Sequence, residues 1–422
     1  MSDFLAPLTS MPPERVRRPF AVSKSSIKIG LVALLFFTAN GAFFRFGAMT
    51  GLVWTAATAL ALVWFVRSPR LMSQLLAQHW AILLLPSFAL LSTTWSASPV
   101  DTAWEGVQML FTCIISLRIV QALTTRQIMI AMMIALVGAT AASVLNLATG
   151  VLKPVYEVNG AFLGIFTQKN TLAKAVYWGA FAVTSVSLIY RRPWIGIIYT
   201  VLSFPLTIIA LSRTGQIGYG FILILLVLAA MRNMPIQSRI LLPVLFGLTL
   251  AGLAIVYVAT GGALIGDFLV LMGKNPTLTG RTVIWGLGLS VWQENMLVGI
   301  GLNSYWTSPV YADAVAFISN NVDDGLHGFH NVYVEYLVAF GIVGAGYLMA
   351  LMVQAWVRLL RAYLTTRSLE AAIWLALLTG LIVFGGFEDS FSKARSSHFM
   401  LAIMAFSIAR RFARERGAGR LS

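Results

Sequence analysis

Residues 127–148 read QIMIAMMIALVGATAASVLNLA, an apolar run of 22 residues without a single charged side chain. One helix of roughly 20 apolar residues is long enough to cross the hydrocarbon core of a bilayer. The run is also continuous, unlike the alternating segments of about 10 residues that build an outer-membrane barrel. It therefore predicts a transmembrane helix and an all-α fold.

Similar runs recur along the whole chain of 422 residues, of which 58% are hydrophobic and 11% charged. A soluble domain has about 25% charged residues, so the composition predicts a polytopic integral membrane protein. We expect about 12 transmembrane helices, near residues 29–44, 46–66, 80–96, 103–123, 127–148, 171–189, 194–211, 216–231, 240–259, 332–353, 370–387 and 396–409. The predicted division is a cytoplasmic tail (1–28), helices one to nine (29–259), a large periplasmic loop (260–330), helices ten to twelve (331–409) and a cytoplasmic basic tail (410–422).

The charges divide unequally between the two ends of these spans. If the amino terminus is cytoplasmic, the cytoplasmic segments hold 21 of the 30 basic residues and only 4 of the 15 acidic ones. This bias is typical of a multi-pass protein of the bacterial inner membrane with both termini in the cytoplasm. Topology and anionic inner-leaflet lipid then explain the net charge of +15, and nucleic acid is not an expected partner. A cleaved signal peptide is the alternative for the first run, but its charged leader is unusually long, so we expect a retained span.

The predicted loop at 260–330 is the one long connection, and function is often located in such an insertion. At helical spacing, Arg281, Trp285, Gly288 and Trp292 share one face. A helix of about 13 residues is too short for another span, so this segment predicts an amphipathic helix lying at the membrane interface.

Arg213 lies in the tight outer connection Ser212-Arg213-Thr214-Gly215, where an arginine goes against the charge bias. One interpretation is a snorkelling anchor at the membrane surface. The other is an anion ligand, because a guanidinium matches the geometry of phosphate and the hydroxyls of Ser212 and Thr214 add donors. Arg281 has the same two interpretations.

Lys169 and Asn170 end a third outer segment, residues 164–170, at the start of the sixth span. Lys169 is either a solvated loop charge or part of the same anion site. Lys174 lies one turn further into the span, where burial is costly, about 2.5–3.5 kcal/mol at a bilayer centre. A lysine near the interface, however, can still reach water.

His330 stands where the long loop enters the tenth span, directly before Asn331. A neutral imidazole at that depth can take a proton from a hydroxyl, which sugar transfer to an acceptor requires. The alternative is a histidine that caps the helix start. His327 lies three residues earlier, and the sequence does not decide which of the two is essential.

Other kinds of site find little support in the sequence. Asp323-Asp324 precedes Gly325 and is better explained by a turn than by a metal site. No other His, Cys or carboxylate grouping has metal-ligand spacing, so we predict neither a metal nor a cofactor. Cys113 is the single cysteine.

The run His330-Asn331, nine residues, Gly341, two residues, Gly344 resembles the signature of the O-antigen ligase and Wzy-type polymerase superfamily. Ala345 departs from it, because glycine, threonine or tyrosine is common there. Three earlier segments resemble that superfamily in the same order: Phe166-x-x-Lys169-Asn170, Ser212-Arg213-Thr214-Gly215, and Gly280-Arg281 through Trp285 to Gly299-x-Gly301.

Within the superfamily the chain is similar to exopolysaccharide polymerases of the succinoglycan type. The resemblance implies a donor glycan on undecaprenyl pyrophosphate at the periplasmic face, and an acceptor that is another lipid-linked repeat or a lipid core. It also implies that Arg213 and Arg281 hold the pyrophosphate while His330 is the base or orienter for the acceptor hydroxyl. We assign substrate binding to the neighbours Lys169, Asn170, Ser212, Thr214, Asn331 and His327.

The expected partners are the lipid-linked oligosaccharide, the acceptor glycan, membrane lipid and other polysaccharide export proteins. Two alternatives to a polymerase remain open from the sequence. One is an O-antigen ligase that transfers the glycan to a lipid core, and the other is a transporter or flippase of lipid-linked sugar. Transporters usually place ionisable residues near the midplane, whereas here the unusual charges gather at one face.

Overall fold

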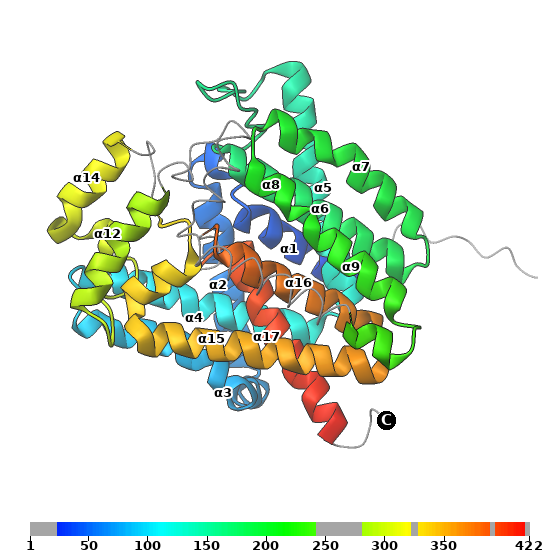
Figure 1. Ribbon diagram of the computed structural model, residues 1–422. Helices are drawn as coiled ribbons and strands as arrows, with labels where there is room; N and C mark the ends of the chain where they lie inside the picture. The colour runs from blue at the N-terminus through cyan, green and yellow to red at the C-terminus, as the bar shows by residue number, and fades with distance from the viewer. Residues whose placement is uncertain (1–22, 242–280, 322–327, 389–392, 418–422) are drawn as a thin grey trace, which may run out of the picture.

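A computed structural model describes residues 23–241, 281–321, 328–388 and 393–417 (Figure 1). All regular elements in these ranges are helices, apart from one isolated bridge between Tyr156 and Phe162, so the all-α fold class is confirmed. In the first half of the chain the helices are α1 (Lys24–Ala39), α2 (Met49–Arg67), α3 (Pro69–Leu91), α4 (Pro99–Ala122), α5 (Thr125–Thr149), α6 (Lys169–Ile189) and α7 (Pro193–Ile209). They are followed by α8 (Arg213–Gly218), α9 (Gly220–Met231), α12 (Arg281–Glu294), α13 (Ser304–Thr307), α14 (Ala312–Asn321), α15 (Val332–Thr366), α16 (Leu369–Gly385) and α17 (Ser397–Gly417).

Seven stretches in the described residues are long and apolar enough to cross a membrane, which supports a membrane-embedded, multi-pass protein. They are Met49–Arg67, Pro69–Thr94, Pro99–Ala122, Thr125–Thr149, Lys169–Ile189, Arg213–Met231 and Val332–Thr366. The two shorter apolar helices are α7 and α16, each of 17 residues. Residues 242–280 lie outside the described residues, and they contain nearly all of the predicted span at 240–259 and the start of the predicted loop. The count of twelve therefore stays a prediction. Helix α17 continues to Gly417, so the first part of the predicted basic tail extends the last helix.

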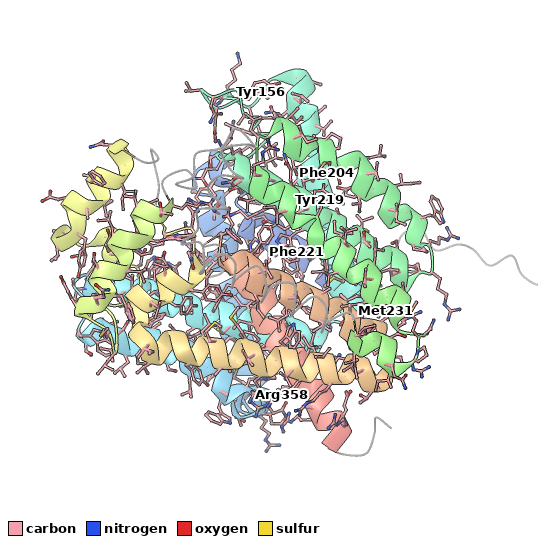
Figure 2. All side chains as sticks on the ribbon, viewed as in Figure 1. Tyr156, Phe204, Tyr219, Phe221, Met231 and Arg358 are labelled. Atoms are coloured by element: carbon pink, nitrogen blue, oxygen red, sulfur yellow. The ribbon has the colours of Figure 1, made fainter. Side chains whose placement is uncertain are left out.

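Helices α16 and α17 lie in the middle of the bundle, with α15 along one side and α5 to α9 along the other (Figure 1). Helix α7 packs beside α8 and α9, where the Phe204 ring meets the Tyr219 ring edge to face at 5.1 Å (Figure 2). The Tyr219 hydroxyl also makes a hydrogen bond of 2.9 Å with Ser203. An aromatic contact and a hydrogen bond between side chains thus link α7 to the junction of α8 and α9, and such interhelical hydrogen bonds are common inside membranes.

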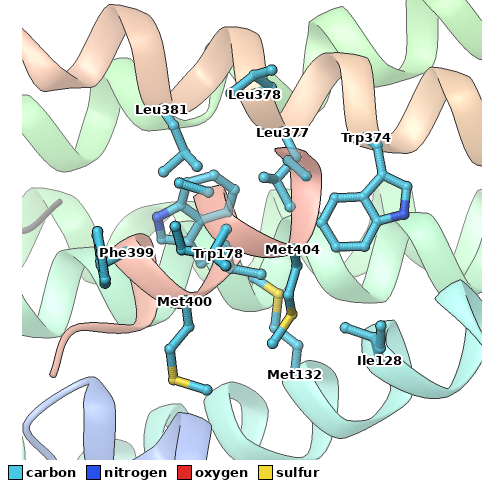
Figure 3. Close-up of a cluster of buried hydrophobic side chains, with 14 of the residues drawn as sticks. Ile128, Met132, Trp178, Trp374, Leu377, Leu378, Leu381, Phe399, Met400 and Met404 are labelled. Carbon is cyan, nitrogen blue, oxygen red and sulfur yellow. The ribbon is translucent and has the colours of Figure 1, made fainter. Parts of the chain in front are cut away.

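The core of the bundle is a cluster of large side chains around α16 and α17 (Figure 3). Trp178 of α6, Trp374 of α16 and Met404 of α17 are completely buried in it. Because lipid tails are as apolar as leucine, association of these helices depends on close packing and dispersion contacts rather than on removal from water. The cluster packs α6, α16 and α17 against one another, and the site described below lies where α6 begins and α16 ends.

The loops at one end of the helices contact one another. The Arg45 guanidinium donates to the Phe166 carbonyl, and the Thr102 hydroxyl donates to the Leu302 carbonyl at 2.8 Å. All four residues belong to segments that the charge bias places on the outer side. At the other end of the bundle, Arg239 donates to the carbonyl of Leu364 at 2.6 Å. These contacts fit alternate crossings of a membrane, and which end is periplasmic stays a prediction.

Helix α15 has 35 residues and is kinked at Gly341, whose φ is 61°. The segment 296–301 lies along the kink and pairs with it through backbone bonds from Ile300 N–H to Val338 (2.9 Å), Gly301 N–H to Ala339 (2.9 Å), Ile342 N–H to Met296 (2.8 Å) and Val343 N–H to Leu297 (3.2 Å). A Cβ added at Gly341 would lie 2.3 Å from the Leu297 backbone, and one at Gly299 would lie 2.5 Å from the Ala339 backbone. Gly299 and Gly341 therefore make room for the close approach of two backbone segments. This contact anchors residues 296–301, near the middle of the predicted loop, beside α15.

Candidate active site

The buried carboxylate of Glu388 lies at the centre of the site. Glu388 follows α16, where its N–H bonds to the Phe384 carbonyl at 2.9 Å, and its side chain is only 5% exposed. One carboxylate oxygen, Oε2, lies 3.3 Å from Lys174 Nζ and 4.0 Å from His330 Nδ1. The other, Oε1, lies 3.9 Å from Arg281 Nη2. Three basic side chains from three separate elements thus surround one carboxylate.

Arg281 is the first residue of α12, and its side chain is 15% exposed. Its Nη1 donates to the Phe387 carbonyl at 2.7 Å, next to Glu388. The predicted amphipathic helix is present over 14 residues, and the face with Trp285 and Gly288 packs on Phe329. A Cβ at Gly288 would meet the Phe329 ring at 2.7 Å, so the helix lies very close to the backbone that precedes His330.

His330 is held by its backbone in the left-handed region, with φ at 49°. On its amino-terminal side, the Glu335 carboxylate accepts from Phe329 N–H and from the Trp306 indole, each at 3.0 Å. On the other side, the Asn331 side chain accepts from the backbone N–H groups of Tyr333 and Val334 and so caps α15. Capping by His330 was one interpretation of the sequence, and it is wrong because Asn331 does this instead. The cap also makes Asn331 a structural residue here, and its predicted substrate contact stays untested.

The His330 imidazole is not committed to the fold. Its Nδ1 is buried and has no hydrogen-bond partner within the described part of the chain, and the side chain is 21% exposed. The separation of 4.0 Å from Glu388 is too long for a hydrogen bond. A shift of about 1 Å would form one, and a bond from Nδ1–H to the carboxylate would leave Nε2 as the proton acceptor.

An aromatic cluster supports the backbone of this loop. The rings of Tyr305 and Trp306 each lie 4.9 Å from the ring of Phe329. Burial raises the pKa of Tyr305 to about 12, with a smaller contribution from neighbouring Tyr311. The phenol of Tyr305 is therefore neutral near pH 7, and this places it among packing residues rather than among bases.

The residues predicted around the start of α6 form a second, adjoining group. Lys169 Nζ lies 3.0 Å from Glu157 in an ion pair that is 28% exposed on both sides. The Ser212 hydroxyl donates to the Asn170 side-chain oxygen at 2.9 Å. Ser212 also accepts from Gly215 N–H at 3.1 Å and caps α8. Ser212 and Asn170 thus tie α8 to α6.

Arg213 begins α8 and is exposed, with Nη1 donating to the Gln216 side chain at 2.9 Å. Within the described ranges no carboxylate pairs with it. A Cβ at Gly215 would lie 2.5 Å from the Ala173 side chain, so α8 packs directly on α6. Thr214, between them, is half-buried.

The first turn of α6 links the two groups. Asn170 and Lys174 are four residues apart and therefore lie on the same face of the helix. Asn170 contacts the cap of α8 that precedes Arg213, and Lys174 contacts the carboxylate beside Arg281. Joint binding of one pyrophosphate by Arg213 and Arg281 stays a prediction, and His327 lies outside the described residues.

Glu388 was not predicted from the sequence. The sequence indicates that Lys174 is costly to bury, but the carboxylate that compensates for its charge was not singled out. The available signal was an acid directly after an apolar run that ends with Gly385-Gly386-Phe387. No group of three or more His, Cys, Asp or Glu side chains suited to a metal occurs in the ranges that the structure covers.

Comparison with known proteins first defines a class. A family model described as O-antigen ligase matches residues 198–349, which include Arg213, Arg281 and His330. The chain is thus a multi-helix membrane protein in which residues 198–349 are similar to the O-antigen ligase family, and the resemblance to that superfamily is confirmed.

A longer part of the chain is similar to one particular known protein. The chain is 26% identical over 287 residues to the exopolysaccharide production protein ExoQ of Rhizobium meliloti (strain 1021). The match covers 64% of this chain and 62% of the relative, or about three fifths of the relative's length. The family model is thus described as a ligase of O-antigen, and the relative is named for the production of exopolysaccharide.

Proposed function

We propose that the protein is an exopolysaccharide polymerase. It transfers a glycan from undecaprenyl pyrophosphate to a hydroxyl of an acceptor sugar at the periplasmic face of the bacterial inner membrane. The observation that carries the proposal is the convergence of Arg281, Lys174 and His330 on Glu388. Two cations and a candidate base thus lie around one buried carboxylate. The resemblance to an exopolysaccharide production protein supports this direction.

The cations serve the leaving group in this proposal. When the bond between the anomeric carbon and the pyrophosphate oxygen breaks, negative charge grows on that oxygen. Arg281 and Arg213 offer planar forks for phosphate oxygens, and Lys174 offers a point charge between them. Donors that are already in place before the reaction stabilise such developing charge without reorganisation. In this arrangement two arginines take the part that a metal ion plays in many other transferases.

His330 serves the acceptor. The acceptor oxygen attacks the anomeric carbon as the pyrophosphate departs on its lipid, and the hydroxyl proton passes to Nε2 of His330. A single displacement of this kind inverts the anomeric configuration. In this proposal a shift of about 1 Å closes the separation of 4.0 Å between Nδ1 of His330 and Glu388, and the resulting hydrogen bond orients the ring. Glu388 thus acts through His330 and the cations rather than on the sugar.

An O-antigen ligase is the second candidate, because the matched family model carries that description. The donor chemistry is the same, and the two differ in the acceptor. Incubation of the pure protein with a defined lipid-linked oligosaccharide, with and without a lipid core, tests both. A ladder of products without lipid core indicates a polymerase, and a single transfer that requires the core indicates a ligase. If the donor is consumed by neither route, both candidate functions are contradicted.

A further inference from the structure

A polar cavity lies at the opposite end of the bundle from Glu388. It has a volume of about 490 Å³ and is formed by α3, α15 and α17. Its lining includes Trp80 of α3, three residues of α15 (Tyr347, Leu351 and Arg358) and two of α17 (Arg410 and Arg414). On α15 these residues follow helical spacing over three turns, so one continuous stripe of that helix forms the wall.

The cavity is strongly basic. Arg358, Arg410 and Arg414 line it, and a smaller neighbouring cavity of about 150 Å³ shares Arg358 and adds Arg361 and Arg416. Among the described residues none of these five arginines forms an ion pair with a carboxylate. The acids at this end, Glu370 and Glu415, pair with Arg411 instead. The positive charge of the cavity therefore has no counter-ion among the residues that the structure describes.

The remaining wall is apolar and aromatic. Trp80 is 57% exposed, directly after the kink in α3 at His79. The Tyr347 hydroxyl donates to the Ala81 carbonyl, so this ring is fixed between α15 and α3. Tryptophan and tyrosine are enriched where a bilayer meets water, because their rings are apolar and their edges polar. Arginines on one side and aromatic rings on the other match a phosphate headgroup with acyl chains.

The position along α15 agrees with a membrane surface. Tyr347 and Arg358 lie 17 and 28 residues after His330, which corresponds to roughly 25 and 40 Å of helix. The longer of these lengths, roughly 40 Å from His330 to Arg358, is about the thickness of a bilayer with its headgroup region. The side chain of Arg358 projects from α15 on the side where α17 passes (Figure 2).

We propose that this cavity binds the phosphate headgroup of one anionic phospholipid, in the leaflet opposite the candidate active site. Arg358, Arg410 and Arg414 hold the phosphate oxygens, and Trp80 and Leu351 contact the glycerol and the first methylenes. The positive-inside bias would place only diffuse charge at this end, whereas a concave group of three arginines, none of them paired with a described carboxylate, forms a defined site. The inference does not depend on the proposed transfer reaction.

Native mass spectrometry of the detergent-purified full chain tests the site directly. Phosphatidylglycerol and phosphatidylcholine with matched chains are added in turn, and the fraction of protein that keeps one lipid is measured at rising collision energy. The test variant is Arg358→Gln with Arg414→Gln. The matched control is Arg67→Gln with Arg70→Gln, which removes the same charge from the same end but lies outside both cavities.

Wild type and control should retain phosphatidylglycerol more firmly than phosphatidylcholine, and the test variant should bind it about tenfold or more weakly. Arg358→Lys with Arg414→Lys should recover part of the binding, which separates loss of charge from loss of fold. Equal retention of both lipids by wild type, or an equal loss in the control, would overturn the site. If inorganic phosphate raises the melting temperature as much as phosphatidylglycerol does, the occupant is a soluble anion and the lipid assignment is wrong.

Discussion

Glu388→Gln removes the one described carboxylate that lies next to both Lys174 and Arg281, and it keeps the shape of the side chain. With distances of 3.3 Å to Lys174 and 3.9 Å to Arg281, the Coulomb attraction is roughly 5 and 4 kcal/mol at an effective dielectric constant of about 20. Desolvation of the charges offsets much of this attraction, and removing one partner of a buried pair costs about 3–5 kcal/mol. Glutamine still offers one carbonyl acceptor to Lys174, so we expect a loss near the lower end, about 3 kcal/mol of unfolding free energy.

The assay is thermal unfolding in detergent, with and without inorganic pyrophosphate as the probe. Glu388→Gln should lower the melting temperature, and pyrophosphate should then stabilise the variant more than it stabilises wild type, because the anion replaces the missing negative charge. Glu370→Gln is the control, since it removes a carboxylate from a half-exposed pair with Arg411 at the other end of the bundle. Such exposed pairs contribute about 0–1 kcal/mol, and the control should gain no extra stabilisation from the anion. An unchanged melting temperature for Glu388→Gln, or the same pyrophosphate response as wild type, would refute the idea that these cations form an anion site.

Arg213→Ala and Arg281→Ala should each insert normally but lose about 2.7–4 kcal/mol of transition-state stabilisation, measured as initial rate, with only partial recovery in the lysine variants; full activity in either would remove that arginine from the site. Gly341→Ala should lower the melting temperature and activity together, because its Cβ would strike the Leu297 backbone, whereas Gly346→Ala has open space and should be harmless; similar melting temperatures for both would show that the kink does not need glycine. With Cys113→Ser as background, Asn320→Cys should react with an impermeant thiol reagent from the periplasm and Gln237→Cys should not; the reverse pattern would invert the topology. His327→Ala should reduce activity less than His330→Ala, and the opposite order would move the base by three residues.

The apolar runs predicted the helices well because length and uncharged composition are local properties of the sequence. Eleven of the twelve runs overlap described helices, and Asn331, singled out for its place in the signature, proves to be the cap of α15. The interpretation of His330 as that cap failed because two adjacent polar residues can both cap a helix, and only the backbone geometry decides between them. The overlap does not establish the span count, since seven stretches of the described residues are long and apolar enough to cross a membrane.

The site was predictable only in part. Arg281 and His330 could be chosen because an arginine and a histidine are unusual at the outer end of apolar segments. Glu388 could not be joined to them, because its contacts bring together α6, α12, the start of α15 and the end of α16, and no spacing in the chain encodes that approach. The role of Gly341 was equally hidden, since the backbone that it accommodates comes from 44 residues earlier in the sequence.

The most direct test of the central claim compares wild type with His330→Ala in vesicles that contain a defined lipid-linked oligosaccharide, with polymer and free undecaprenyl pyrophosphate both quantified. A general base contributes about 10²–10⁴ in rate, so wild type should release one lipid pyrophosphate for each linkage formed and the variant should form no detectable polymer at an unchanged melting temperature. Near-normal polymer from a folded His330→Ala variant would contradict the account.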